Sequence, residues 1–402
     1  MEPRAPAPVL RLAFAAALFA FPALLFTAFD KAPARALGAA LTLGVIALAM
    51  QRGGKRLACA DDVPAFAAIL AFLAVSALEA LAWHAPFWMV VNYARLLGVV
   101  IVALAIRRLQ PSASALYMGC AIAATLAGIV AIEQCFVDGL PRAEGLDPPF
   151  GEPLTNIFAG LAVVFGFVAV SAGRPTRTTL AVFAWIAFAG GLVAAFLSGS
   201  RGAWVAAAVL AVWVFGRKRP WIGVALAAAF VVASFGVDML AARWSAGYSD
   251  LVLYNNGNAD TSLGSRIQLW SAALAAFSSH PLLGIGPDGL RDFFLAREAR
   301  GQLSRYAIQF GHAHNEWLQA LATGGLVQAI ALAAAFWFPW RRFRAAGARR
   351  DSPAARAGES VVLGFFVLGL TDTFFIHRVA LTVFVVVVTW LLAWTEQPGD
   401  RW

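Results

Sequence analysis

Long apolar stretches separated by short polar segments run along the whole chain. A helix that crosses the hydrocarbon core of a membrane needs roughly 20 mostly apolar residues, and about twelve stretches come near that length. They lie approximately at 9–28, 34–50, 63–83, 86–106, 114–137, 156–172, 178–198, 202–216, 220–237, 316–340, 358–376 and 379–395. The pattern predicts an all-α integral membrane protein with about twelve transmembrane helices.

The polar segments between these stretches differ greatly in length. One of them, 238–314, is far longer than the others, and the next, 138–155, is a loop rich in proline and glycine. The chain is therefore expected to divide into membrane helices at 1–237, a large loop with short helices of its own at 238–314, and further membrane helices at 315–402. No internal repeat is evident in the sequence, which counts against the repeated halves of secondary transporters.

Composition and charge agree with a membrane location. Apolar residues make up 61% of the chain and charged residues 13%, against roughly 25% charged in soluble domains. With the N-terminus in the cytoplasm, Lys and Arg gather in inner segments such as 52–56, 174–177, 217–219 and 341–350, as they do in cytoplasmic loops. This orientation places both termini inside and 238–314 outside. Because the net charge of +9 largely reflects this bias, it does not indicate nucleic-acid binding.

Ionisable residues are concentrated toward the outer side. All five histidines fall in outer loops or at outer helix ends: His84, His280, His312, His314 and His377. Glu79, Glu133 and Asp372 lie near the outer ends of their predicted helices, where they either face a water-filled pocket or reach the membrane interface. Arg95 lies deeper in a predicted helix, and for it a paired structural role is favoured over contact with substrate.

The tripeptide Gly-Ser-Arg occurs twice on the outer side, at 199–201 and 264–266, each time before an apolar stretch. Serine is a favoured N-cap, and Ser265 has capping-box spacing to Gln268, so each arginine is expected in the first turn of a helix. A cation there opposes the helix dipole at a cost of about 0.3–1 kcal/mol. The position suggests a bound anion, with ordinary capped helices as the alternative. The expected anion-binding residues are Ser200, Arg201, Ser265 and Arg266.

The stretch 289–310 combines basic and apolar residues. Its arginines are Arg291, Arg297, Arg300 and Arg305, interleaved with Leu290, Phe293, Phe294 and Leu295. A helix of this composition can lie on a membrane surface and attract anionic headgroups, and the alternative is a solvated basic face. These arginines, together with Asp372 and Arg378, are candidates for contact with an acceptor or for lining a pocket.

Three motifs follow one another in the outer segment: Arg-x-x-x-Trp at 266–270, HPLLGIG at 280–286 and His-Asn-x-x-Leu at 314–318. With these motifs, the chain resembles the O-antigen ligase and polymerase superfamily of multispan membrane glycosyltransferases over roughly 196–340. The resemblance implies a GT-C-like helical fold. It also implies transfer of a glycan from undecaprenyl pyrophosphate at the periplasmic face of the inner membrane of a Gram-negative bacterium.

The resemblance further implies roles for individual residues. Arg201 and Arg266 correspond to pyrophosphate-binding arginines, and His314, unlike His312, corresponds to the catalytic histidine. The chemistry is consistent with this, because a sugar on a pyrophosphate is already activated and needs cations for the leaving group and a base for the attacking hydroxyl. Histidine, with an ordinary pKa near 6.5, is a suitable base. Apart from Glu316, the sequence fixes no carboxylate beside it that could act as a second nucleophile, so a single inverting displacement is expected.

No metal ion or other cofactor is expected. The outer segments carry no Asp-x-Asp cluster of the kind that holds a divalent ion. His312, His314 and Glu316 could gather around zinc only on an extended strand, because alternate residues share a face there. The apolar pattern that follows them predicts a helix instead.

The expected activity is that of a ligase that joins the glycan to lipid A-core oligosaccharide. Polymerases of this superfamily tend to have two sizeable outer loops, whereas this chain has one. A polymerase or a protein O-oligosaccharyltransferase is the alternative within the superfamily. A transporter or flippase that binds a lipid-linked anion with the same arginines is the alternative of another class. The expected partners are the lipid-linked donor, the lipid A-core acceptor and membrane lipid.

Overall fold

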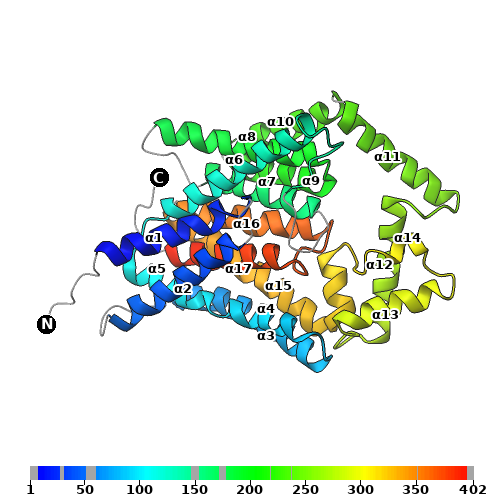
Figure 1. Cartoon of the computed structure of the whole chain (residues 1–402), viewed down its shortest axis with the longest axis horizontal. Helices are drawn as coiled ribbons and strands as arrows, with labels where there is room; N and C mark the ends of the chain where they lie inside the picture. Colours follow the sequence, from blue (N-terminus) through cyan, green and yellow to red (C-terminus); the bar gives the residue numbers. More distant parts are fainter. Residues whose placement is uncertain are drawn as a thin grey trace.

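The computed structural model describes residues 8–27, 31–50, 60–145, 154–171, 178–217, 219–236, 238–350 and 352–395. In this part of the chain every regular element is a helix (Figure 1). The elements are α1 (Pro8–Ala23), α2 (Ala32–Met50), a short 3₁₀ helix (Ala60–Asp62), α3 (Val63–Ala82), α4 (Phe87–Leu96), α5 (Val99–Leu109), α6 (Ser114–Phe136), α7 (Thr155–Ser171), α8 (Thr178–Ser198), α9 (Arg201–Gly216), α10 (Pro220–Gly236), α11 (Asp238–Asn255), α12 (Ser262–Ser279), α13 (Pro287–Glu298), α14 (Arg305–Ile308), α15 (Glu316–Arg350), α16 (Pro353–Gly369) and α17 (Arg378–Trp394). The predicted all-α class is confirmed.

Among the described residues, six helical stretches are long and apolar enough to cross a membrane: Ala32–Met50, Ala60–Ala82, Phe87–Leu109, Ser114–Phe136, Thr178–Ser198 and Glu316–Arg349. Shorter apolar helices accompany them at Pro8–Ala23, Thr155–Ser171, Arg201–Gly216 and Arg378–Trp394. The chain is therefore a multi-pass membrane protein, and each apolar stretch found in the sequence contains helix. The basic segments 52–56 and 174–177, which entered the predicted orientation, lie outside the described residues.

Two of the predicted helix ends differ most from the structure. The stretch predicted to run to 376 ends at Gly369, because the chain turns there to place Asp372 between α16 and α17. The stretch predicted to end at 340 continues to Arg350, since Phe343 and Ala346 are buried and the Phe343 ring fills the space beside Gly358 of α16. Packing against α16 thus stabilises the last part of α15 beyond its apolar region.

The centre of the bundle consists of helices buried on nearly all sides. Almost every side chain of α7, α16 and α17 is buried, including the consecutive valines 385–388. Figure 1 shows α16 and α17 in the middle, with α3 and α4 on one side and α8 and α10 on the other. Small residues let helices approach closely, as in many membrane bundles. A Cβ added to Gly128 of α6 would lie 2.7 Å from the Cα of Gly190 in α8.

Segment 238–314 forms α11 to α14 at one end of the bundle (Figure 1). Helices α12 to α14 share a small apolar core that includes Leu269, Leu290, Phe294 and Leu303. The prediction that the apolar residues of 289–310 rest on a membrane surface is therefore wrong for Leu290 and Phe294, which are buried against α12, and Leu295 alone of the four is well exposed. The arginines of this stretch lie on a solvated or partly solvated face instead.

The HPLLGIG segment stabilises a break in α15. At Gly325 the backbone leaves the helical conformation, with φ of 62°, and segment 281–286 docks there through backbone hydrogen bonds. Ile285 and Gly286 donate to the carbonyls of Ala322 and Thr323 at 3.0 and 2.8 Å. On the other side of the break, Leu326 donates to the carbonyl of Pro281 at 2.8 Å. The loop thereby satisfies backbone groups that an interrupted helix would leave unpaired within the membrane protein.

A buried ionic network ties helices together at the opposite end of the bundle. Asp62 accepts hydrogen bonds from Arg107 of α5 and Arg342 of α15, and it is 1% exposed. Arg342 also donates to Thr395, just after α17. A buried carboxylate held by two guanidinium groups is stable only when all three remain paired, so this network fixes α3, α5, α15 and α17 relative to one another.

Candidate active site

His314 is held at the start of α15, as the sequence predicted. The carboxamide oxygen of Asn315 accepts from the backbone N–H groups of Trp317 and Leu318, both at 3.0 Å, and so caps the helix. His314 itself has a φ of 48°, a left-handed conformation that histidine adopts more readily than most residues. Asn315 Nδ2 also donates to the carbonyl of Leu370 at 3.0 Å. These contacts aim the His314 side chain at the turn between α16 and α17.

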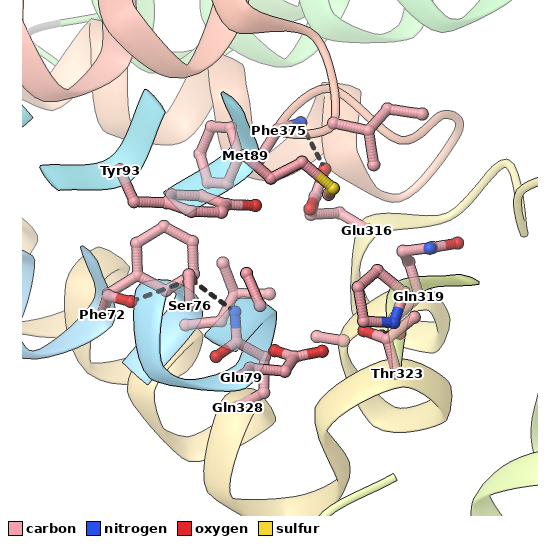
Figure 2. Close-up of a pocket in the computed structure, with 15 residues that line it drawn as sticks. Phe72, Ser76, Glu79, Met89, Tyr93, Glu316, Gln319, Thr323, Gln328 and Phe375 are labelled. Atoms are coloured by element: carbon pink, nitrogen blue, oxygen red, sulfur yellow. Dashed lines mark hydrogen bonds between the residues drawn. The ribbon is translucent and has the colours of Figure 1, made fainter. Parts of the chain in front are cut away.

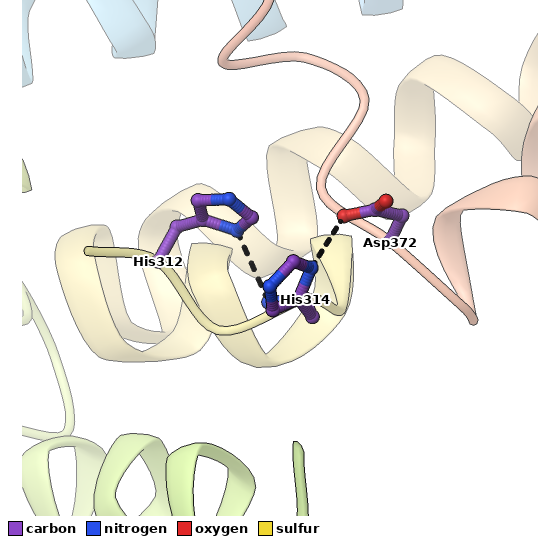
Figure 3. A group of neighbouring side chains, drawn as sticks. All are labelled: His312, His314 and Asp372. Carbon is purple, nitrogen blue, oxygen red and sulfur yellow. Dashed lines mark hydrogen bonds and ion pairs between the residues drawn. The ribbon is translucent and has the colours of Figure 1, made fainter. Parts of the chain in front are cut away.

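His314 and Asp372 form a partly buried pair (Figure 3). The Nδ1 atom of His314 lies 2.9 Å from Oδ1 of Asp372, and their side chains are 12% and 9% exposed. Burial raises the pKa of Asp372, but the hydrogen bond and charge of His314 outweigh this and leave the pKa below its ordinary value. An ionised Asp372 fixes the Nδ1–H tautomer of His314, which leaves Nε2 free to accept a proton.

His312 has a different environment although it is two residues away. Its Nδ1 accepts a hydrogen bond from the backbone N–H of His314 at 3.3 Å, and its ring lies 4.2 Å from that of His314. Burial, reinforced by the charge of His314, lowers the pKa of His312 to about 3. His312 is therefore neutral at physiological pH and supports the backbone of the neighbouring histidine.

Arg201 lies where the sequence predicted, but Arg266 does not. Arg201 is the first residue of α9, with Ser200 at the N-cap position. The capping box predicted for Ser265 is wrong, because Thr261 caps α12 by accepting from the backbone N–H of Gly264 at 3.0 Å. Arg266 is consequently beyond the first turn of α12, which begins at Ser262. Its charge opposes the helix dipole less than expected, since that effect is confined to the first turn.

Arg266 lies within electrostatic range of Asp372 and of Arg201. Among the described residues, neither guanidinium group donates a hydrogen bond or forms an ion pair. Burial lowers the pKa of Arg266, the charge of Asp372 opposes this, and the charge of Arg201 adds to it. A Cβ on Gly247 of α11 would clash with the Arg201 guanidinium, so that glycine leaves space for the side chain.

Asn156 joins these parts, and the sequence analysis missed it. Its Nδ2 donates to Oδ2 of Asp372 at 2.6 Å, and its Oδ1 accepts from the hydroxyl of Ser200 at 2.9 Å. A continuous chain of hydrogen bonds therefore runs from the helix start that carries Arg201 to the His314 ring. The available signal was an amide side chain at the start of an apolar stretch, directly after the Pro/Gly-rich loop.

Both serines of the Gly-Ser-Arg tripeptides have internal partners. Ser200 is 5% exposed and donates to Asn156, while Ser265 is 1% exposed and donates to the carbonyl of Ser262 at 3.2 Å. Neither hydroxyl points into open space. The structure thus brings Arg201 and Arg266 to the site and assigns their serines to its support.

The other candidate residues are spread over several surfaces. Arg291, Arg300 and Arg305 are exposed, and Arg297 donates to Gln302 at 3.0 Å. Arg378 begins α17, with its guanidinium over the ring of Trp88. Of the predicted pocket acids, Glu133 is exposed.

Glu79 faces a separate polar pocket between α3, α4 and α15 (Figure 2). Its polar lining comprises Ser76, Glu79, Tyr93, Glu316, Gln319, Thr323 and Gln328. The cavity volume of about 60 Å³ suits a few water molecules, which need about 10–15 Å³ each, better than a sugar. Glu316 belongs here rather than beside His314, because its carboxylate accepts from the backbone N–H of Phe375 at 2.8 Å.

In the described part of the chain, one cluster has the residues to hold a metal ion. Ligand atoms of His312, His314 and Asp372 lie within 4.8 Å of one another, whereas Glu316, the third ligand considered from the sequence, faces Phe375. The cluster lies in the field of Arg266 and Arg201, which opposes a divalent cation and favours an anion. The arrangement is thus better suited to a base next to a negatively charged group.

Comparisons with known proteins agree with this arrangement. Residues 182–333 match the protein family described as O-Antigen ligase. A curated protein of Haemophilus influenzae, itself uncharacterized, is 27% identical over 223 residues, which cover 52% of this chain and 54% of that protein. The chain spans about half the length of the curated relative that it matches. The matched region contains both site arginines and His314, so residues 182–333 are similar to the O-antigen ligase family.

Proposed function

We propose that the chain is a glycosyltransferase that moves a glycan from undecaprenyl pyrophosphate to lipid A-core oligosaccharide, on the periplasmic side of a bacterial inner membrane. One observation carries this proposal. A partly buried His314–Asp372 pair lies within electrostatic range of Arg266, which lies near Arg201, and neither guanidinium group has a partner among the described residues. Attack of a hydroxyl on a sugar pyrophosphate requires a base for the proton and cations for the leaving group.

The roles follow from the chemistry. Nε2 of His314 accepts the proton of the acceptor hydroxyl as its oxygen attacks the anomeric carbon. The bond from that carbon to the pyrophosphate oxygen breaks, and Arg201 and Arg266 stabilise the departing charge. Asp372 stabilises the imidazolium that forms, as a carboxylate does in other histidine–aspartate pairs. A single displacement from the opposite face inverts the anomeric configuration, and no metal ion takes part.

The His314–Asp372 pair favours this function over transport of a lipid-linked anion. A binding site for an anion needs the arginines but gains nothing from a buried carboxylate that fixes the tautomer of a histidine. Ligase and polymerase differ in the acceptor, so purified protein is given the lipid-linked donor with either lipid A-core or a second lipid-linked glycan. We expect a new glycosidic bond when lipid A-core is the acceptor. If product forms only when the second lipid-linked glycan is the acceptor, the protein is a polymerase.

The test of the site uses His314→Ala with His312→Ala as the matched control. Loss of a general base typically costs 10²- to 10⁴-fold in rate, and donor affinity should remain because the arginines are intact. His312→Ala should cost much less. An active His314→Ala protein would refute the assignment of the base, as would an inactive one that has also lost donor binding and thermal stability.

A further inference from the structure

A second cavity lies in segment 238–314, where α11, α12 and α13 meet. Its volume is about 180 Å³, which is room for about a dozen water molecules and therefore for one sugar ring. Polar side chains form most of its lining: Tyr254 of α11, Gln268 and Ser271 of α12, Arg297 of α13 and Gln302 just after α13. No carboxylate is among the described residues that line it.

One amide side chain fixes the walls of this cavity. Oε1 of Gln268 accepts from the backbone N–H of Ser304 at 2.8 Å. Nε2 of the same side chain donates to the carbonyl of Ala259 at 3.1 Å and to the hydroxyl of Ser304 at 3.3 Å. Gln268 thus holds the loop before α12 and the loop after α13 against this helix. A site whose walls are fixed in advance loses less conformational entropy when a ligand binds.

Several donors of the lining remain available to a ligand. Nε of Arg297 donates to Oε1 of Gln302 at 3.0 Å, and the guanidinium carbon lies 5.4 Å from the ring centroid of Phe293. These contacts restrict the guanidinium group, but among the described residues neither of its Nη nitrogens donates a hydrogen bond. The hydroxyl groups of Tyr254 and Ser271 likewise have no hydrogen-bond partner in the described part of the chain. A guanidinium fork and hydroxyl groups beside an aromatic ring suit the hydroxyl or carboxylate groups of a sugar.

The cavity lies on the other side of α12 from the proposed pyrophosphate site. Gln268 follows Arg266 by two residues, and because a helical turn takes about 3.6 residues, the two side chains leave nearly opposite sides of α12. A helix is about 10–12 Å wide, so a group in the cavity is not the sugar that reacts beside Arg266. Figure 1 shows α12 and α13 at the end of the bundle, outside the central helices. A sugar farther along the same glycan can reach this position.

We propose that this cavity is a subsite for one sugar unit of a glycan, at a distance from the bond that reacts. The binding of carbohydrate does not depend on the proposed function, whereas the assignment of that carbohydrate to a substrate of transfer rests on it. The glycan of the donor and the core oligosaccharide of the acceptor present the same chemistry to the cavity, so the experiment tests each separately.

Binding is measured without lipid and without transfer. O-polysaccharide and core oligosaccharide, each released from lipopolysaccharide by mild acid, are added separately to the purified protein in a detergent without a sugar headgroup, and binding is followed by saturation-transfer NMR. Binding of the O-polysaccharide assigns the cavity to the donor, and binding of the core oligosaccharide assigns it to the acceptor. Ser271→Trp fills the cavity and should abolish the signal. Ser278→Trp is the matched control, because it adds the same side chain at an exposed position two turns further along α12, and it should leave the signal unchanged.

Arg297→Gln is a smaller change that keeps the proposal testable if Ser271→Trp does not fold. Loss of the guanidinium fork should weaken glycan binding about tenfold, the effect of one charge-assisted hydrogen bond. Arg142→Gln, which changes an exposed arginine elsewhere, should bind like the wild type. Binding of neither glycan by the wild-type protein would overturn the proposal, and so would binding of wild-type strength by folded Ser271→Trp.

The role of the cavity in transfer is then measured kinetically. If the O-polysaccharide is the ligand, Ser271→Trp should raise the KM for a donor with many repeat units about tenfold and leave the KM for a single-sugar donor unchanged. If the core oligosaccharide is the ligand, the KM for the acceptor should rise instead. Glycan binding without any transfer would refute the proposed function and keep the subsite. Transfer with every KM unchanged in Ser271→Trp would refute the assignment of the cavity to a substrate.

Discussion

Exchanging the side chains of Asn156 and Asp372 tests the hydrogen-bond chain that supports the proposed base. In Asp372→Asn, one oxygen can still accept from Nδ1 of His314, but the new amide group then faces the amide of Asn156, donor against donor. The added substitution Asn156→Asp restores an acceptor at that position. The new carboxylate can still accept the hydrogen bond that the Ser200 hydroxyl donates to Asn156 at 2.9 Å.

The magnitude follows from the bonds involved. A hydrogen bond to a charged group contributes about 1.5–3 kcal/mol, and every 1.36 kcal/mol is a factor of ten. Asp372→Asn should therefore lower kcat about 10- to 150-fold. The exchanged pair should recover roughly tenfold of this, because the contact between residues 156 and 372 is complementary again. It should not reach the wild-type rate, since the group next to His314 is now neutral.

The assay is the initial rate of glycolipid formation at saturating donor, measured together with the melting temperature of each protein. Asn156→Asp alone is the matched control, and it should be strongly impaired because two carboxylates then face each other. If Asp372→Asn is folded and keeps the wild-type kcat, the base does not depend on this carboxylate. If the double variant is folded but no faster than Asp372→Asn, the hydrogen bond between residues 156 and 372 does not support the base.

Three further predictions concern the same site. Arg201→Ala and Arg266→Ala should each abolish or strongly reduce transfer in a folded protein, with partial rescue by lysine because the charge remains but the planar fork is lost; full activity of either alanine variant would remove that arginine from the pyrophosphate site. Transfer should survive exhaustive EDTA treatment, and loss of activity that Mg²⁺ or Mn²⁺ restores would contradict a leaving group stabilised by arginines alone. Because the pKa of Asp372 is lower in the folded than in the unfolded chain, its charge stabilises the fold above about pH 4 and this contribution is lost as the pH falls further. The difference in melting temperature between wild type and Asp372→Asn should therefore be smaller at pH 3 than at pH 7, and an equal difference would contradict the role of the carboxylate charge.

The sequence predicted those features of the site that depend on local pattern. An apolar run after a polar amide indicated the helix start at His314, and a serine before an apolar run placed Arg201 correctly in α9. The same rule failed at Arg266, because Thr261 and Ser265 are both acceptable caps and pattern alone does not choose between positions four residues apart. The prediction of an anion site did not depend on this error, because it required only the approximate location of each arginine.

Contacts between distant segments were beyond such reasoning. Asn156 and Asp372 are 216 residues apart, and their hydrogen bond depends on how α7 packs beside the turn that follows α16. That turn was itself hidden, since the apolar pattern continues past Gly369 although the helix does not. The hydrogen bond from Arg95 in α4 to Thr382 in α17 likewise depends on how these two helices pack, which neither sequence stretch specifies alone.

The docking of segment 281–286 into the break at Gly325 limits how specificity could be re-engineered. Loops are usually the natural units for exchange between relatives, because they tolerate replacement better than helices do. Here Gly284 and Gly325 leave no room for a Cβ against the backbone they meet, and the loop supplies hydrogen bonds on both sides of the break. A graft that replaced 238–314 and kept the host α15 would pair two surfaces that never evolved together. In a chimera, the junction should instead lie a few turns after the break at Gly325. The loop, His314 and both sides of the broken helix then come from the same protein.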